Sequence, residues 1–213
     1  MYNKCVITAV ALRRSVMKKR ISALSLAVLM SVFSFAAAGC ENSDDIMPPK
    51  EILENYSLEQ AKADGCVVHE NGDVTSGKDI FKIFYARTSS GKKADVRLAF
   101  YYTLGDPSGY DPDYYESIKN DYPALYIQDL TFDGEKYTLR WYEDGKEIVE
   151  SYDYLMKYNE PKLSPYAVYE SSEEYILTND NTITRQDLWN GALSSQYDAY
   201  IEHQVVCSDF IYE

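Results

Sequence analysis

Hydrophobic and polar residues alternate most clearly between Ala94 and Thr103. Every second residue there is apolar or aromatic, and the intervening positions include the charged Asp95 and Arg97 as well as Ala99 and Tyr101. Successive side chains of a β-strand point to opposite faces of a sheet, so this pattern predicts a strand with one buried face. The face expected to be buried consists of Val96, Leu98, Phe100 and Tyr102.

Three further alternating segments follow one another, over residues 125–132, 136–142 and 147–157. Asp133-Gly134 joins the first pair and Asp144-Gly145 joins the second. Asp-Gly between alternating segments is a strong hairpin signal, because both residues tolerate a positive φ. These segments therefore predict an antiparallel meander of three strands.

Helical signals occur between the strands. Ser57 and Gln60 have capping-box spacing before Gly65, which predicts a short helix over residues 58–64. Three apolar residues at helical spacing predict a second helix, capped by Ser76 and Asp79 and ending near Gly91. The apolar residues of that helix are Ile80, Phe81 and Phe84.

Two more helices and three more strands complete the predicted elements. Pro112 favours the start of a short helix, and Thr184 is expected to cap another. The apolar stripe of this last helix consists of Leu188, Trp189, Ala192 and Leu193. The remaining strands are expected at residues 66–69, 166–177 and 200–207. Together the elements predict a single α+β domain over residues 57–213, an antiparallel sheet of about five or six strands with a central meander and helices packed on one face.

The N-terminal segment has the pattern of a signal peptide. Residues 1–39 contain six basic and no acidic residues, and an uncharged stretch from Ile21 to Gly39 follows a basic group that starts just after Met17. Ala37-Ala38-Gly39-Cys40 resembles a bacterial lipobox, although Leu is commonest at the first of these positions. We therefore expect translation to start at Met17 and the mature protein at Cys40. A transmembrane helix and ordinary secretory cleavage are the alternatives.

The lipobox implies that the membrane is one partner, reached through a diacylglyceryl group on Cys40. Residues 40–56 are polar and acidic and contain Pro48-Pro49, which predicts a lipidated tether. The expected location is the outer face of the cytoplasmic membrane. Two acyl chains hold a protein on a bilayer without a spanning helix, since each buried CH₂ contributes about 0.8 kcal/mol.

Composition and charge narrow the choice of function. The chain has 213 residues and a formal net charge of -13, which argues against nucleic acid as a partner, since a phosphate backbone requires a basic surface. Outside the leader and the lipid site, two cysteines remain, Cys66 and Cys207. In an extracytoplasmic protein they either form a disulfide or stay as two buried free thiols. Neither a CxxC pair nor a Cys/His spacing typical of zinc is found in the sequence.

Candidate chemistry is sparse. Asp106, Asp111 and Asp113 form either a weak Ca²⁺ site or a solvated acidic turn, and the turn is the favoured interpretation. Residues 179–188 resemble half of an EF-hand loop but put Ile176 at a required ligand position, so a turn followed by a helix cap explains them better. The two histidines, His69 and His203, lie in no recognisable catalytic motif. We therefore predict no catalytic residue, no metal and no cofactor.

Tyrosine is the one unusual feature of the composition, with 21 residues. Tyr101, Tyr126 and Tyr142 fall on predicted strands, where they either form an outer surface that binds glycan or peptide or simply cover the sheet.

The stretches ENGDVTSGKDIFKIFYARTSSGKKADVRLAFYYTLGDP and YIQDLTFDGEKYTLRW are similar to an uncharacterised family of Gram-positive, especially clostridial, lipoproteins. They also resemble a domain of unknown function in bacillus lipoproteins. The shared pattern is an Asn-Gly-Asp turn, an amphipathic helix, a strand, a Gly-Asp-Pro and an Asp-Gly hairpin in this order. The resemblance implies a surface-tethered location and supplies no catalytic residues.

These observations predict a lipid-anchored, non-enzymatic binding or envelope-associated module, with a cell-wall glycan or an envelope protein as its partner. The alternatives are an enzyme or enzyme inhibitor of the cell-wall space and a purely structural role. Carboxylates with raised pKa values in a pocket would favour an enzyme.

Overall fold

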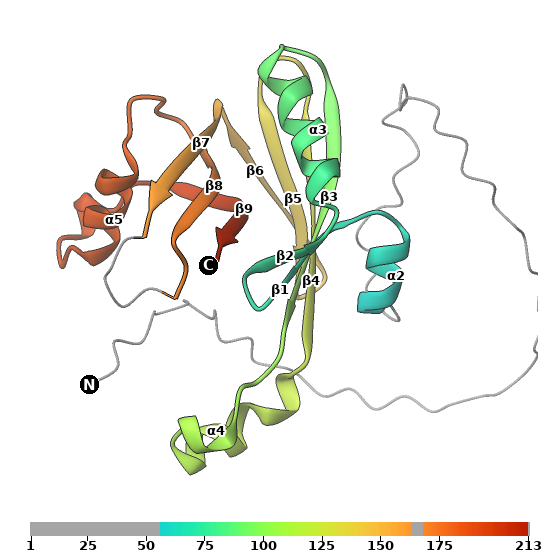
Figure 1. Ribbon diagram of the computed structural model, residues 1–213, viewed down its shortest axis with the longest axis vertical. Helices are drawn as coiled ribbons and strands as arrows, with labels where there is room; N and C mark the ends of the chain where they lie inside the picture. The colour runs from blue at the N-terminus through green and yellow to red at the C-terminus, as the bar shows by residue number, and fades with distance from the viewer. Residues whose placement is uncertain (1–55, 163–167, 213) are drawn as a thin grey trace, which may run out of the picture. The chain divides into compact units, whose positions relative to one another are not determined.

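The computed structural model of this protein describes residues 56–162 and 168–212, which form two β-sheets and several helices. One sheet has six strands in the order β2-β1-β3-β4-β5-β6, and the other has three in the order β7-β8-β9 (Figure 1). The first sheet comprises β1 (Val67–Glu70), β2 (Asp73–Ser76), β3 (Ala94–Tyr102), β4 (Ala124–Phe132), β5 (Tyr137–Glu143) and β6 (Lys146–Tyr152). The second comprises β7 (Tyr154–Pro161), β8 (Ser171–Thr178) and β9 (His203–Ile211). The helices are α2 (Leu58–Ala63), α3 (Lys78–Ser89), α4 (Pro112–Ile118) and α5 (Arg185–Leu193), with short 3-10 helices η2 (Pro107–Gly109), η3 (Lys119–Asp121) and η4 (Tyr197–Ala199).

The predicted meander is confirmed as β4, β5 and β6, which pair antiparallel in sequence order. Gly134 and Gly145 have positive φ angles in the two Asp-Gly turns, as this hairpin chemistry requires. The predicted third strand was too long, because the chain bends at Asp153 and continues as β7 of the second sheet. At that bend, the Asn179 side chain accepts the backbone N–H of Asp153.

The sequence predicted an antiparallel sheet, but the first sheet contains one parallel pair of strands. β1 pairs with β3 in parallel, while the other pairs in this sheet are antiparallel. β1 turns back at Asn71-Gly72 into β2, a strand that the sequence pattern did not predict. α3 then reverses the chain direction again, so β3 runs alongside β1 in the same direction.

Helices contact both faces of this sheet, so the prediction that they pack on one face is wrong. Val67 and Val68 point to opposite faces of β1, and both are fully buried. Val67 belongs to the main core with Phe81 and Phe84 of α3. Val68 belongs to a smaller core with Ala61 of α2. The short strand β1 is therefore covered on both sides, which explains its continuous apolar sequence.

The starts of the helices follow the sequence in two cases and depart from it in one. The predicted capping box of α2 is present, and Thr184 caps α5 through a capping box with Asp187. α3 instead begins after Gly77, which has a φ of 75° and offers no side-chain cap. A Cβ atom at Gly77 would lie 2.5 Å from the carbonyl oxygen of Cys66. Close packing of the backbone on β1 therefore replaces the cap that Ser76 and Asp79 were expected to provide.

The main core draws side chains from both sheets. Tyr175 of β8 makes edge-on ring contacts with Phe81 and Tyr85 of α3. Lys78, at the start of α3, forms an ion pair with Asp209 of β9. These contacts place α3 against the second sheet as well as the first, so the two sheets share one hydrophobic cluster.

α5 covers β8 with only part of its predicted apolar stripe. Leu188 is buried with Ile176 and Ile183, whereas Trp189 and Leu193 are exposed. The stripe was predicted too wide, because this nine-residue helix contacts the sheet through a narrow face.

The N-terminal predictions concern residues outside the described part of the chain. They are the signal peptide over residues 1–39, the start at Met17, lipidation at Cys40 and the tether over residues 40–56, apart from Tyr56 itself. Among the described helices, none has the length and apolar character needed to cross a membrane.

Candidate functional site

The three tyrosines that the sequence predicted as one surface do not share a face. Strand register places Tyr101 with Ala99 and Ile127 on the face that α2 covers in part. Tyr142 lies on this face too, next to Arg140, and its hydroxyl donates to Glu147. Tyr126 pairs with Phe100 and therefore points to the opposite face. Side chains alternate along each strand, so the prediction of a common surface is wrong.

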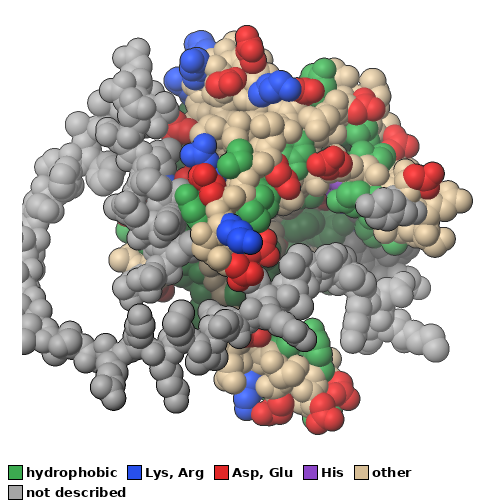
Figure 2. Space-filling view, turned by 180° about the vertical axis from the view of Figure 1, so that it is seen from behind, with side chains coloured by type: hydrophobic (Ala, Val, Ile, Leu, Met, Phe, Trp, Pro, Cys, Tyr) green, Lys and Arg blue, Asp and Glu red, His purple; other side chains and the backbone are tan. Residues whose placement is uncertain are grey.

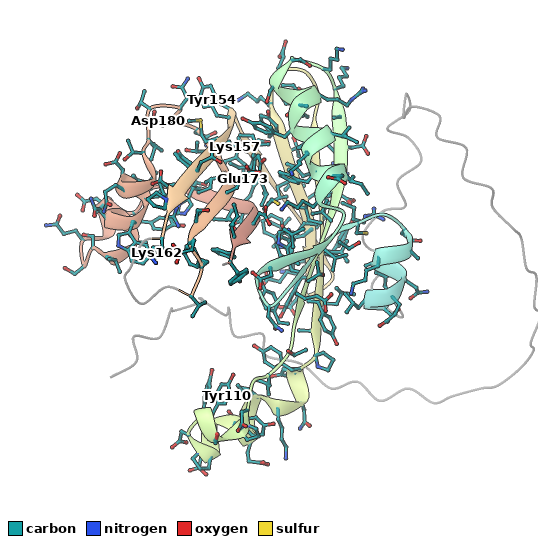
Figure 3. All side chains as sticks on the ribbon, in the orientation of Figure 1. Tyr110, Tyr154, Lys157, Lys162, Glu173 and Asp180 are labelled. Carbon is teal, nitrogen blue, oxygen red and sulfur yellow. The ribbon has the colours of Figure 1, made fainter. Side chains whose placement is uncertain are left out.

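Tyr126 belongs instead to a group of tyrosines at the connection between β3 and β4. We call this group the tyrosine cluster; it consists of Tyr102, Tyr110, Tyr114, Tyr115, Tyr122 and Tyr126. Tyr102 ends β3, Tyr126 lies near the start of β4, and the other four belong to the connecting segment. Figure 3 labels Tyr110 in this segment, beyond the ends of both strands.

Local sequence explains how the connecting segment folds. The Asp106 carboxylate accepts the N–H of Ser108 and caps η2. The Asp111 carboxylate accepts the N–H groups of Asp113 and Tyr114 and caps α4, which starts at Pro112 as predicted. Two carboxylates thereby fix two consecutive short helices and hold their tyrosines in place.

The ring contacts within the cluster form two groups, Tyr110 with Tyr114 and Tyr115, and Tyr102 with Tyr126. Tyr110 stacks on Tyr114 with ring centroids 6.4 Å apart, and its ring centroid lies 5.7 Å from that of Tyr115. Tyr102 and Tyr126 meet edge to face at 6.1 Å. Aromatic pairs prefer such offset and edge-on arrangements within about 7 Å. The Gly105 N–H also donates to the Tyr110 hydroxyl, at 3.4 Å.

The cluster is open to solvent although it is aromatic. None of the residues of η2, α4 and η3 is buried. Tyr114 is 56% exposed and Tyr126 is 49% exposed. Core tyrosines of this protein are different, since Tyr175 is only 3% exposed. Each exposed ring packs against a half-buried one, Tyr114 on Tyr110 and Tyr126 on Tyr102. Exposed aromatic rings held in this way are typical of recognition sites.

The electrostatics of the cluster combine neutral rings with negative surroundings. The pKa of Tyr122 is raised by burial and then by the neighbouring hydroxyls of Tyr126, Tyr114 and Tyr110. The pKa of Tyr102 is raised in the same way, by burial and by Tyr126 and Tyr122. These phenols therefore stay protonated at neutral pH.

The connecting segment itself is acidic. Residues 103–123 carry five acidic side chains and one basic side chain. The acidic residues are Asp106, Asp111, Asp113, Glu116 and Asp121, and the basic residue is Lys119. In Figure 2, red carboxylates lie next to green side chains, a class that includes tyrosine, at the bottom of the view.

The acidic residues of this segment do not form a metal site. The Asp106 and Asp111 carboxylates hold the N–H groups of their own helices, as the favoured turn interpretation predicted. Nowhere in residues 56–162 and 168–212 do three His, Cys, Asp or Glu side chains gather in a way that could hold a metal ion. Residues 179–188 likewise form the predicted turn and helix cap, since the Asp180 carboxylate accepts the N–H of Thr182.

The two cysteines remain as buried free thiols, so the disulfide alternative is wrong. Cys66 packs with α2 in the smaller core, whereas Cys207 of β9 packs in the main core. The first sheet separates these two clusters, and the thiols therefore have no route to one another. Burial raises the pKa of Cys207 to about 12, so this thiol is protonated and unreactive.

The histidines occupy separate places in the fold. His69 of β1 is buried and stacks on Phe100 at 4.7 Å. His203 begins β9, and its Nδ1 lies 2.7 Å from the carbonyl oxygen of Ile201. Both imidazoles thus contact another ring, and that of His203 also a backbone carbonyl, which indicates structural roles.

A second group of charged residues supports the packing of the second sheet. The Tyr175 hydroxyl donates to Glu173, and Lys157 pairs with the same carboxylate at 2.7 Å. Figure 3 labels Lys157 and Glu173 side by side on β7 and β8. Burial opposes ionisation of Glu173, but these two hydrogen bonds outweigh it and lower its pKa. The carboxylate is therefore ionised and satisfied, which indicates a structural ion pair.

The sequence contained a signal for the tyrosine cluster that the strand pattern concealed. Seven of the 21 tyrosines fall within residues 101–126. Alternation along strands groups tyrosines of separate strands, such as Tyr101, Tyr126 and Tyr142. The local density of tyrosines predicts better which of them lie close together.

Comparisons with protein-family models, with curated proteins and with solved structures found no match to this chain.

Proposed function

We propose that this protein is a lipid-anchored, extracytoplasmic binding module without enzymatic activity, and that the tyrosine cluster is its recognition surface. The observation that carries the proposal is the grouping of six tyrosines, two of them with exposed rings, at an acidic, helix-capped connection. Exposed rings held against one another lose little conformational freedom when a ligand covers them.

The proposed location rests on the N-terminal sequence. A basic segment, an uncharged stretch and Cys40 in a lipobox-like setting support attachment through a diacylglyceryl group, as does the resemblance to clostridial lipoproteins. In this arrangement, the tether over residues 40–56 links the membrane to the folded part. The partner would then be a component of the cell envelope within reach of the tether.

The test compares retention of variants by envelope preparations. The probe is the mature chain with Cys40→Ser, so that lipid binding does not contribute. The cluster variant carries Tyr114→Ser and Tyr126→Ser, which remove two exposed rings without touching the core. The matched control carries Tyr154→Ser and Tyr200→Ser, which are 38% and 57% exposed elsewhere on the protein. Tyr142→Ala serves as a third variant on the opposite sheet face.

We expect equal retention of the Cys40→Ser probe without further changes, of the control and of Tyr142→Ala. The cluster variant should lose about tenfold or more in apparent affinity. Equal retention of the cluster variant and the control would contradict the proposed surface. Circular dichroism of each variant checks that the fold is unchanged.

A further inference from the structure

We propose that the tyrosine cluster binds a Lys- or Arg-rich segment of a polypeptide. This inference rests on the proposed function, because it assigns a ligand class to the same surface. Two features of the connecting segment carry it, namely the charge that surrounds the rings and the exposure of the ring faces.

The surroundings of the rings favour a cation. Lys119 is the only basic residue between 103 and 123, and its ammonium pairs with Glu116 at 2.6 Å. Four further carboxylates in this segment have no basic partner within it. Those of Asp106 and Asp111 accept backbone N–H groups in their own helix caps. Hydrogen bonds at Ser108 lower the pKa of Asp106, so that this carboxylate stays ionised well below neutral pH.

The rings favour a cation as well. An ammonium or guanidinium group placed over a tyrosine face is attracted by the quadrupole of the ring, within about 6 Å of its centre. The protein already contains one such contact, because the Lys157 ammonium lies 5.4 Å from the ring centroid of Tyr175. The exposed rings of Tyr114 and Tyr126 belong to or border this acidic segment.

A neutral glycan is the other class of ligand that exposed tyrosines suit. Sugars would stack on the same rings and donate hydroxyl hydrogen bonds to carboxylates, but an uncharged sugar gains no Coulomb attraction from a net negative surrounding. Anionic wall polymers and lipid headgroups would be repelled by it. Charge complementarity therefore favours a cationic peptide segment over a glycan.

The experiment measures binding of defined probes to the purified full-length protein in neutral detergent. The probes are a fluorescent peptide of alternating Lys and Ala, the same peptide with Glu in place of Lys, and a fluorescent neutral chito-oligosaccharide. Fluorescence anisotropy is recorded at low and at high salt. We expect the Lys peptide to bind at low salt and to weaken about tenfold or more at high salt, while the Glu peptide does not bind.

Matched variants separate the contributions of charge and ring. Asp113→Asn, Glu116→Gln and Asp121→Asn together remove three carboxylates that cap no helix. The control removes three exposed carboxylates elsewhere, through Glu135→Gln, Asp144→Asn and Asp198→Asn. The first triple variant should lose about tenfold or more in affinity for the Lys peptide, and the control should stay within about twofold of the wild type. Tyr114→Ser should weaken binding even with every charge in place.

Each other outcome contradicts the inference in a distinct way. Binding of the oligosaccharide but not the Lys peptide, with loss in Tyr114→Ser, would overturn the peptide assignment and leave the proposed surface intact. Binding of the Lys peptide that the control triple variant weakens as much as the cluster variant would mean attraction to overall negative charge only. Binding of neither probe, together with unchanged envelope retention of the cluster variant, would overturn both proposals.

Discussion

At the scale of single residues, His69 is the side chain with the clearest energetic consequence. It is 3% exposed and stacks on Phe100, and its Nε2 atom has no hydrogen-bond partner among the residues that the structure describes. Burial lowers its pKa from 6.5 to about 4. The imidazole is therefore neutral in the folded protein at pH values where the unfolded chain would already bind a proton.

Acid should destabilise the protein through this residue. Because the folded pKa is lower than the unfolded pKa, stability is complete above about pH 6.5 and falls as pH decreases toward 4. Between pH 7.5 and pH 5 we expect a loss of about 2 kcal/mol in the free energy of unfolding. Urea unfolding at several pH values measures it.

The variant His69→Leu should remove this part of the pH dependence, whatever its own stability at pH 7.5. His203→Gln retains His69 and should retain the acid sensitivity. If wild type and His69→Leu lost the same free energy over this pH range, His69 would not be its source.

The cysteines give a second prediction at this scale. In a mature chain with Cys40→Ser, Cys66 and Cys207 are the remaining thiols, both buried and free. A thiol reagent should label neither in the folded protein and both after denaturation without a reductant. Denatured protein that stays unlabelled until a reductant is added would reveal a disulfide and contradict the structure.

At the scale of elements, the junction of β2 and α3 depends on one glycine. Gly77 has a φ of 75°, and an added Cβ would lie 2.5 Å from a backbone oxygen of Cys66. Gly91 has a similar φ of 73° after the other end of α3, but an added Cβ there would meet nothing within 4 Å. The two positions thus share backbone strain and differ in steric contact.

Alanine at each position separates these effects. Gly91→Ala should cost about 1 kcal/mol of unfolding free energy, from the left-handed conformation alone. Gly77→Ala should cost at least about 2 kcal/mol more, because β1 and α3 must also move apart. Chemical denaturation of both variants tests this difference. Equal losses would show that the close approach of the two backbones at Gly77 does not affect the free energy of unfolding.

The elements also show what sequence can and cannot predict. Short-range chemistry was sufficient for the hairpins at Asp133-Gly134 and Asp144-Gly145 and for the caps at Ser57 and Thr184, since each depends on neighbours within a few residues. The parallel pairing of β1 with β3 could not be predicted in this way. This pairing depends on which strand β3 lies beside after α3, and contacts between residues far apart in the sequence decide it.

The candidate site, too, could be predicted from the sequence only in part. The α4 helix could be predicted from Asp111 and Pro112, and the density of tyrosines around it was visible in the sequence. The meeting of Tyr126 with Tyr102 depends on the register of β3 against β4. A shift of one residue would move Tyr126 to the opposite face together with Leu130 and Phe132, so burial of these two residues fixes the register.

At the scale of the whole molecule, charge separates the proposed leader, residues 1–39, from the rest of the chain. Removal of the six basic residues in 1–39 leaves 15 basic and 34 acidic residues, a formal net charge of -19 for the mature chain. Such a chain is repelled by anionic headgroups and wall polymers. The proposed lipid on Cys40 must therefore hold the protein against an unfavourable electrostatic term.

The variant Cys40→Ser should accordingly be released from the membrane fraction into the medium, and salt should not be needed for its release. The wild type should stay in the membrane fraction after a high-salt wash, because acyl chains and not charges hold it. Cell fractionation with immunoblotting measures both. A Cys40→Ser protein that stays with membranes at high salt would contradict lipid anchoring.

The central claim is that the tyrosine cluster is the recognition surface, and ¹⁹F NMR of the 3-fluorotyrosine-labelled protein tests it most directly. Tyr114→Phe and Tyr126→Phe assign two cluster signals, and Tyr154→Phe and Tyr200→Phe assign two exposed tyrosines elsewhere. On titration with the Lys-Ala peptide, we expect the signals of Tyr114 and Tyr126 to shift together, with those of Tyr154 and Tyr200 unchanged. Shifts confined to Tyr154 or Tyr200, or spread evenly over all four, would contradict the claim.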